Sequence, residues 1–205
     1  MPEINPALEN VGTGFAAFLS PPGPEVIRFT VGQPDFDTPE PVVEEAKAAL
    51  DRGETAYTRT QGSVELCQAV AKHLSIHDIA ADPDDVVVTP GCKQAVLYAM
   101  MATLKAGDEV LLLSPAWPSY DGMLKLLNCV PIHVPVRRDN YHPDFNALEN
   151  AVTSKTKAVM LNSPNNPTGA VYTPQEIQQL LDFAKKHDLW IIDDMIYATL
   201  AWTDY

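Results

Sequence analysis

Short apolar runs alternate with segments of helical composition from residue 85 to the end of the chain. Aliphatic and β-branched residues dominate the runs, which is typical of strands that are buried on both faces of a sheet. The runs are DVVVT at 85–89, EVLLL at 109–113, VPIHVPV at 130–136, KAVMLN at 157–162 and DLWIID at 188–193. We expect the helices between them at 93–104, 119–127, 144–151 and 173–187. The alternation predicts an α/β fold, a three-layer αβα architecture with a mainly parallel sheet.

The first 90 residues follow a different pattern. Residues 1–24 are rich in Pro, Gly and Asn and have no periodicity, so we expect an N-terminal arm there. The segment 39–53 predicts a helix with Thr38 as its cap and Gly53 at its end. A second helix is expected at 63–76, where apolar residues recur at spacings of three and four.

Composition and charge narrow the class of protein. The chain has 205 residues, of which 46% are hydrophobic and 20% charged, so it is long enough to bury a core and unlike a disordered segment. Its formal net charge of −13 leaves no basic surface for nucleic acid or for an anionic membrane. Any phosphate group must therefore be bound by a local arrangement of donors.

The cysteines and the N-terminus suggest a location. Cys67, Cys92 and Cys129 are widely spaced and odd in number, which predicts neither a disulfide framework nor a metal-binding C-x-x-C pair. The first residues lack the pattern of a signal peptide, and no run approaches the roughly 18 apolar residues of a membrane span. We therefore expect a soluble, cytoplasmic protein without a metal site.

Four loops that follow or adjoin predicted strands contain residues suited to ligand binding. They are TPGCKQ at 89–94, SPAWPSY at 114–120, NSPNNPTG at 162–169 and DMIY at 194–197. In parallel α/β sheets, ligands bind outside the carboxyl ends of the strands, so these loops should converge at one edge.

Each loop alone has two interpretations. The start of a helix at Gly91–Lys93 could bind a phosphate or be an ordinary turn. Trp117 could stack on a planar ligand or pack against the core, and Asp194 could be a helix cap or a buried carboxylate with a chemical role. Together the loops fit a planar phosphorylated heterocycle such as pyridoxal phosphate. An unrelated α/β nucleotide-binding protein is the alternative, although neither G-x-G-x-x-G nor G-x-x-x-x-G-K-[ST] is present.

The chain resembles the N-terminal portion of the class I/II (fold-type I) pyridoxal-phosphate-dependent aminotransferases, in the aspartate aminotransferase-like branch. Six segments occur in the order typical of that family. They are VGQPDFDTP at 31–39, AYTRTQG at 56–62, TPGCKQA at 89–95, SPAWPSY at 114–120, NSPNNPTGAVY at 162–172 and DDMIY at 193–197. The resemblance implies an arm and substrate loop at 1–45, a partial, truncated PLP-binding large domain at 46–205, and an absent C-terminal small domain.

The resemblance also implies residues that bind substrate and phosphate. Gly32 would lie in the loop that meets the substrate carboxylate, and Tyr57 would reach the cofactor phosphate of a neighbouring subunit. Gly91, Cys92 and Lys93 correspond to the phosphate-binding turn. Because the backbone N–H groups bind the phosphate there, the thiol can stand where small residues such as Ala or Ser are common.

The remaining implied residues surround the cofactor ring. Trp117 would stack on the pyridine ring, and Asn166 and Tyr197 would bind its phenolic oxygen. Asp194 would pair with the protonated pyridine nitrogen, so Asp194 and Tyr197 are the expected catalytic residues. A buried anion keeps that nitrogen cationic, which lets the ring accept electrons from the substrate Cα. The family usually has Glu where this chain has Met195, a position that is not among these contacts.

The implied function is transamination between an amino acid and a 2-oxo acid by a homodimer that uses pyridoxal 5′-phosphate. Family members place the Schiff-base lysine and the carboxylate-binding arginine beyond the position that matches Tyr205, so we expect these 205 residues alone to be inactive. The alternative is a non-catalytic truncated remnant with at most weak binding of pyridoxal phosphate. Neither nucleic acid nor membrane is an expected partner.

Overall fold

The computed structural model describes residues 23, 25–27, 32 and 35–202. The described residues divide into two compact units, one that ends at residue 90 and one that begins at residue 91. The expected arm at 1–24 lies almost entirely outside the described residues. The predicted boundary between the arm and the large domain, at residue 45, stays a prediction.

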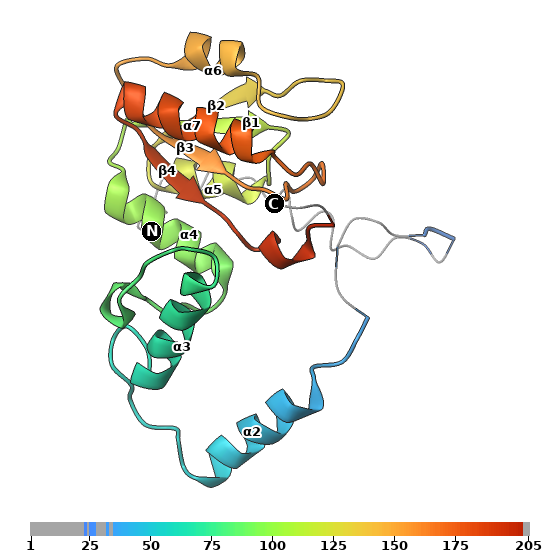
Figure 1. Cartoon of the computed structure of the whole chain (residues 1–205), viewed down its shortest axis with the longest axis vertical. Coiled ribbons are helices and arrows are strands. Elements are labelled where there is room, and N and C mark those ends of the chain that lie inside the picture. Colours follow the sequence, from blue (N-terminus) through green and yellow to red (C-terminus); the bar gives the residue numbers. More distant parts are fainter. Residues whose placement is uncertain (1–22, 24, 28–31, 33–34, 203–205) are drawn as a thin grey trace, which may run out of the picture. The chain divides into compact units, whose positions relative to one another are not determined.

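Four strands of the second unit form a parallel sheet. They are β1 (Glu109–Ser114), β2 (Val130–Pro135), β3 (Thr156–Leu161) and β4 (Trp190–Asp193). Their order across the sheet is β2-β1-β3-β4, and each neighbouring pair is parallel (Figure 1). The predicted α/β class and the four corresponding apolar runs are thereby confirmed.

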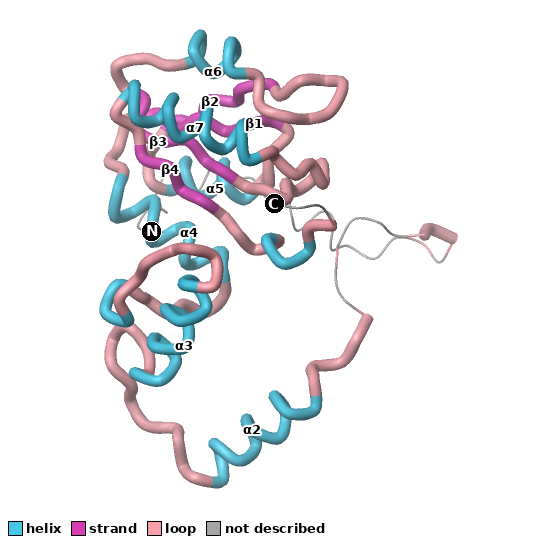
Figure 2. Tube along the Cα trace, in the orientation of Figure 1, coloured by secondary structure: helices cyan, strands magenta, loops and turns pink. Residues whose placement is uncertain are grey.

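Both faces of the sheet are buried, which explains why the strands are continuously apolar. On one face Leu111 is paired with Ile132 and Val159, and this row packs under α6 (Phe145–Ala151) and α7 (Pro174–His187). On the other face Leu112 and its neighbours pack under α4 (Cys92–Thr103) and α5 (Ser119–Leu126). Figure 2 shows the strands between these helices, which is the predicted three-layer arrangement.

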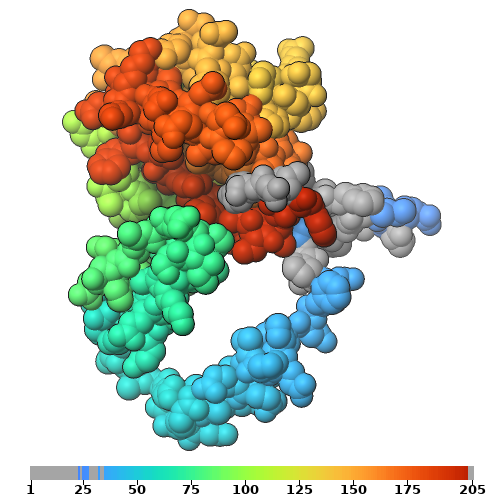
Figure 3. Space-filling view, viewed as in Figure 1, coloured from blue at the N-terminus to red at the C-terminus, as the bar shows by residue number. Residues whose placement is uncertain are grey.

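The helix boundaries follow local capping rules. Ser63 accepts from the N–H of Leu66 at the start of α3 (Val64–Ser75), and Asp144 caps α6 in the same manner. Thr173 and Glu176 form a reciprocal capping box at the start of α7. Helix α7 forms much of the outer surface of its unit in the space-filling view (Figure 3). All four helices predicted in this unit are present, with ends that differ from the prediction by one residue at most.

The unit that ends at residue 90 contains α2 (Glu40–Asp51), α3 and the short 3₁₀ helix η2 (Pro83–Asp85). Cys67 and Ala71 on α3 pack against Val86 in a small core. Gly62 precedes α3 with φ +121°, and a Cβ there would lie 2.8 Å from a methyl carbon of Val88. The close approach of Val88 and the positive φ together require glycine at this position.

Two local predictions were wrong. Thr38 does not cap α2, because the N-cap is Pro39 and the helix has no side-chain cap. The run at 85–89 does not form a strand in the described chain: the N–H of Val88 bonds to the carbonyl of Gln61, and Val86 packs against α3 instead. A strand requires a partner from elsewhere in the sequence, and composition alone does not supply one. In the described part of the chain, no helix has the length and apolar character needed to span a membrane.

Glu176 connects the start of α7 to the segment after β2. Its side chain is only 13% exposed and accepts the backbone N–H and hydroxyl of Thr173 at 2.9 and 3.0 Å. Nδ1 of His142 lies 2.7 Å from the carboxylate, and Arg137 also bonds to it. Burial opposes ionisation, but the hydrogen bonds from Thr173 and His142 outweigh it and hold the pKa of Glu176 below its ordinary value.

We predict that Glu176→Gln destabilises the chain at neutral pH, because Gln keeps the capping geometry but lacks the charge. A lowered carboxyl pKa stabilises the folded state above the unfolded pKa of about 4.3, and this contribution is lost as the pH falls through the folded pKa. The difference between the wild-type and Glu176→Gln free energies of unfolding should therefore shrink below about pH 4. Urea unfolding at a series of pH values measures it. The matched control is Asp182→Asn on the exposed face of the same helix, and a constant difference for Glu176→Gln would contradict the prediction.

Candidate active site

The predicted loops meet at the carboxyl end of the sheet. The N–H of Asp194 bonds to the carbonyl of Leu161, so the segment after β4 continues alongside the end of β3. Asn162 follows β3 directly and donates its side-chain amide to the carbonyl of Asp194 at 2.8 Å. The start of α4 and the start of α5 contribute Cys92 and Tyr120, which both contact the Asp194 side chain. The structure thus brings residues from three other loops to Asp194, two to its carboxylate and one to its backbone carbonyl.

Asp194 is the centre of this arrangement. It is 4% exposed, and its two carboxylate oxygens accept three hydrogen bonds. The hydroxyl of Tyr120 donates to Oδ2 at 2.7 Å, while the thiol of Cys92 and the N–H of Ile196 donate to Oδ1, each at 3.3 Å. All three donors are neutral. The carboxylate is therefore well hydrogen-bonded but without a cation among these partners.

The two side-chain donors keep their protons. Burial, followed by the proximity of Asp194, raises the pKa of the Cys92 thiol to about 11. Burial and the hydrogen bond to Asp194 also raise the pKa of Tyr120 far above its ordinary value. At neutral pH both groups act as donors to the carboxylate and neither acts as a base.

A second series of hydrogen-bonded polar groups lies beside Asp194. The side-chain oxygen of Asn162 accepts the N–H of Asn166 at 2.8 Å, and the amide of Asn166 donates to the hydroxyl of Tyr197 at 3.3 Å. Asn165 and Gly169, which has φ +72°, close the tight turn that follows. The predicted pair Asn166 and Tyr197 is thus brought together, with side chains that face the same edge.

The start of α4 has the form of an anion-binding turn. Gly91 is the N-cap, with φ +85° and ψ 162°, a region that is essentially restricted to glycine. As a glycine, the N-cap contributes no side-chain cap of its own to the first turn of α4. Such a helix start presents N–H groups and the positive end of the helix dipole. Lys93 lies over the ring of Trp117, with Nζ 5.0 Å from its centroid.

Trp117 and Tyr120 are held together at the start of α5. Their rings meet edge to face, with centroids 5.3 Å apart and an interplanar angle of 87°. Trp117 is partly exposed and packs against the core under α4 and α5. Its position is compatible both with stacking on a ligand and with packing alone.

Gly32 and Tyr57 belong to the unit that ends at residue 90. Gly32 is exposed, and the Tyr57 side chain is fully exposed. Their predicted roles toward substrate and phosphate stay predictions.

Two residues of the site were not predicted, Tyr120 and Asn162. Tyr120 stands three residues after Trp117 within SPAWPSY, and Asn162 is the first residue of NSPNNPTG. Both therefore lie inside loops that the sequence predicts to bind a ligand. Their partnership with Asp194 spans 74 and 32 residues of sequence and has no local signal.

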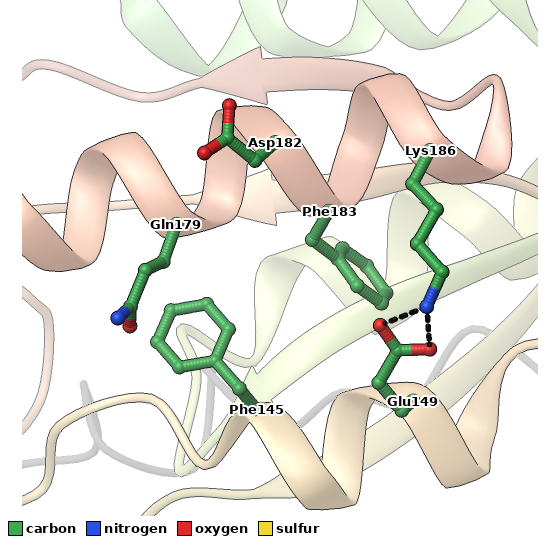
Figure 4. Close-up of a pocket in the computed structure, with 6 residues that line it drawn as sticks. All are labelled: Phe145, Glu149, Gln179, Asp182, Phe183 and Lys186. Carbon is green, nitrogen blue, oxygen red and sulfur yellow. Dashed lines mark hydrogen bonds and ion pairs between the residues drawn. The ribbon is translucent and has the colours of Figure 1, made fainter.

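A surface pocket between α6 and α7 is separate from these residues. It has a volume of about 320 Å³ and is lined by Phe145, Glu149, Gln179, Asp182, Phe183 and Lys186 (Figure 4). Two of its lining residues, Lys186 and Glu149, form an ion pair, in which Lys186 donates to both carboxylate oxygens of Glu149 at 2.7 and 2.9 Å. The pocket brings together no group of the predicted site.

Comparison with known proteins decides the family. The family described as "Aminotransferase class I and II" matches residues 24–205. The chain belongs to this family. The aspartate aminotransferase of Thermotoga maritima is 45% identical over 186 residues, which cover 89% of this chain and 49% of that protein. Aromatic-amino-acid aminotransferase 2 of Thermococcus litoralis is 42% identical over 175 residues, covering 84% of this chain and 45% of that protein.

Solved aminotransferase structures share the fold. The crystal structure of the Thermotoga maritima aspartate aminotransferase superposes with a TM-score of 0.88 at 39% identity and covers 98% of this chain and 56% of that chain. Alanine aminotransferase from Pyrococcus furiosus gives a TM-score of 0.89 at 29% identity, with coverage of 95% and 52%. The aminotransferase chain described here spans about half the length of these relatives.

Asn162 offers a test of the polar network. The buried side-chain amide of Asn162 donates to the Asp194 carbonyl and accepts from the Asn166 N–H. A buried polar group that lacks a hydrogen-bond partner lowers the free energy of unfolding by about 1–3 kcal/mol. We predict that Asn162→Ala lowers the free energy of unfolding by about 2 kcal/mol or more, measured in urea. The exposed Asn150→Ala on α6 is the control, with an expected change below about 0.5 kcal/mol. Equal effects of the two substitutions would show that the network contributes nothing to stability.

Proposed function

We propose that the whole protein carrying these residues catalyses pyridoxal-phosphate-dependent transamination between an amino acid and a 2-oxo acid. The observation that carries the proposal is the buried Asp194 carboxylate, which has only neutral donors among its described partners. A buried anion of this kind is suited to a cationic N–H group, such as a protonated pyridine nitrogen.

The other residues of the site fit the same cofactor. The start of α4, with glycine as its N-cap, suits a phosphate group, and the Trp117 ring suits stacking on a pyridine ring. Asn166 and Tyr197 are hydrogen-bonded to each other and offer polar groups to the phenolic oxygen of the cofactor ring. When bound, pyridoxal phosphate supplies a sink for the electrons released when the substrate loses its Cα proton.

The chain's own residues would set the charge of the ring nitrogen. Asp194 would hold a proton on that nitrogen by stabilising the cation. Cys92 and Tyr120, with pKa values raised by burial, keep their own protons and stabilise the carboxylate as the anion. The network therefore favours a cationic ring.

Covalent attachment of the cofactor and transfer of the Cα proton require a lysine, and the family resemblance places it beyond these residues. Lys93 lies over Trp117 at the start of α4 and is not proposed for that role. We infer that the 205 residues alone bind pyridoxal phosphate weakly and are inactive, and that the whole enzyme works in the cytoplasm. Relatives named for aspartate, aromatic amino acids and alanine leave the amino donor open.

Pyridoxine 5′-phosphate tests the site without covalent attachment, because it lacks the aldehyde. We predict that this chain binds it more tightly than it binds pyridoxine, and that Asp194→Asn weakens the binding about tenfold or more, since a hydrogen bond to a charged group contributes about 1.5–3 kcal/mol. Calorimetric titration measures both effects. The control is Asp139→Asn on the exposed segment after β2.

In the whole protein, Asp194→Ala should lower the rate of amino transfer roughly a hundredfold or more, for about 3 kcal/mol lost at the ring nitrogen. Amino acids and 2-oxo acids are screened as substrate pairs with added pyridoxal phosphate. Tight cofactor binding without transfer from any amino acid would favour the alternative, a non-catalytic remnant.

The proposed enzyme is a homodimer that shares its active sites. The fully exposed Tyr57 side chain supports this, since its implied role requires a second subunit to bring it to a phosphate. Light scattering on the whole protein should give twice the mass of one chain. A stable and active monomer would contradict the proposal.

A further inference from the structure

The two carboxylate oxygens of Asp194 have different environments. Oδ1 accepts two hydrogen bonds, from the Cys92 thiol and the Ile196 N–H, each at 3.3 Å. Oδ2 accepts one, from Tyr120 at 2.7 Å. Each oxygen of an ionised carboxylate has about two acceptor sites. Among the described residues, the capacity of Oδ1 is therefore filled and Oδ2 retains one site.

We propose that Cys92 is a positioning residue: its side chain holds Oδ1 of Asp194 and so leaves Oδ2 as the oxygen that binds the cationic N–H of the ligand. The identity of that ligand rests on the proposed function. The pairing of Cys92 with Asp194 does not, because it is a property of the chain alone.

The geometry gives Cys92 two contacts at once. It is the first residue of α4, so its backbone N–H belongs to the anion-binding turn, while its side chain reaches Asp194, 102 residues away in sequence. A residue without a donor, such as Ala or Gly, would serve the turn equally well but would leave Oδ1 with one partner. The thiol thus couples the position of the turn to the orientation of the carboxylate.

The environment of the thiol supports a donor and disfavours a nucleophile. Burial and Asp194 raise the pKa of Cys92 to about 11, whereas reactive cysteines have lowered pKa values. The described titratable group that acts on this thiol is Asp194, an acceptor, while the neighbouring Lys93 has its Nζ over the ring of Trp117. Cys92 therefore remains a thiol, with its hydrogen available to the carboxylate.

Infrared spectroscopy of the S–H stretch tests the pairing directly, because this band lies in a window free of other protein bands. The difference between the spectra of the wild-type chain and Cys92→Ala isolates the Cys92 band. We expect the band at a lower frequency than that of a free thiol, and a shift to higher frequency in Asp194→Asn, whose amide oxygen is a weaker acceptor. A wild-type band at the free-thiol frequency overturns the proposal, whether or not Asp194→Asn folds.

Alkylation by iodoacetamide gives a second measurement. Removing the charge of Asp194 should favour the thiolate, so Asp194→Asn should speed the modification of Cys92 about three- to tenfold at fixed pH, as a lower pKa is partly offset by lower nucleophilicity. Peptide mapping follows Cys129 in the same sample as the control. Its thiol lies near Asp108 and bonds to the carbonyl of Lys105, so its rate should not change. An unchanged Cys92 rate in folded Asp194→Asn contradicts the pairing.

Ligand binding tests the consequence for the site. Cys92→Ala should weaken the binding of pyridoxine 5′-phosphate about three- to tenfold, a loss of roughly 1 kcal/mol or slightly more, and Cys92→Ser should restore most of it. Inorganic phosphate is the matched probe, because residue 92 would contact it through the backbone N–H alone, so it should bind Cys92→Ala and wild type equally. Equal weakening for both ligands overturns the positioning role.

The two proposals fail separately. If no form of the chain binds pyridoxine 5′-phosphate, then the assignment of Oδ2 to a ligand is wrong, whereas the transamination proposed for the whole protein is decided by its amino-transfer assay. The infrared band still decides whether Cys92 holds Asp194.

Discussion

A carboxylate removed from water must be compensated by donors or by a cation, and Asp194 imposes this requirement on every loop around it. Tyr120, Cys92 and Ile196 supply the donors, while Asn162 holds the backbone carbonyl of the same residue. These partners come from the starts of two helices and the ends of two strands. One buried charge therefore fixes the mutual position of segments that are far apart in the sequence.

The paired strands of the sheet end in a fixed register. This register holds the loops that surround the buried carboxylate in place. β1 and β3 are paired on both sides and covered on both faces, so the loops that leave them start from the most rigid part of the unit. In the described part of the chain, each buried side-chain amide or hydroxyl of the polar network has a hydrogen-bond partner. The site is thus organised before any ligand binds, which reduces the cost of ordering it on binding.

Much of this organisation could be predicted from the sequence. The four strands and the helices between them follow from local periodicity, and the meeting of the loops follows from the rule for parallel sheets. The side chains that satisfy Asp194 could not be predicted, because their contacts join residues 74 and 102 positions apart. The strand prediction at 85–89 was wrong for the same reason: the composition of this run suits a strand, but strand pairing depends on a partner that is distant in the sequence. The roles of Gly32 and Tyr57 rest on the family resemblance alone.

Glycine is required at positions 62 and 91 for different reasons, and at position 91 the reason is the chirality of the other amino acids. At Gly62 an added L side chain would meet both an unfavourable φ and the methyl group of Val88. At Gly91 no atom of a described residue beyond its chain neighbours lies within 4 Å of the position of a Cβ, so space is not the constraint. Its φ of +85° and ψ of 162° are close to the mirror image of an ordinary extended residue. The turn that we propose for phosphate thus contains one residue of reversed handedness, a conformation that a D-amino acid could adopt without strain. Among the genetically encoded residues, only achiral glycine can supply it.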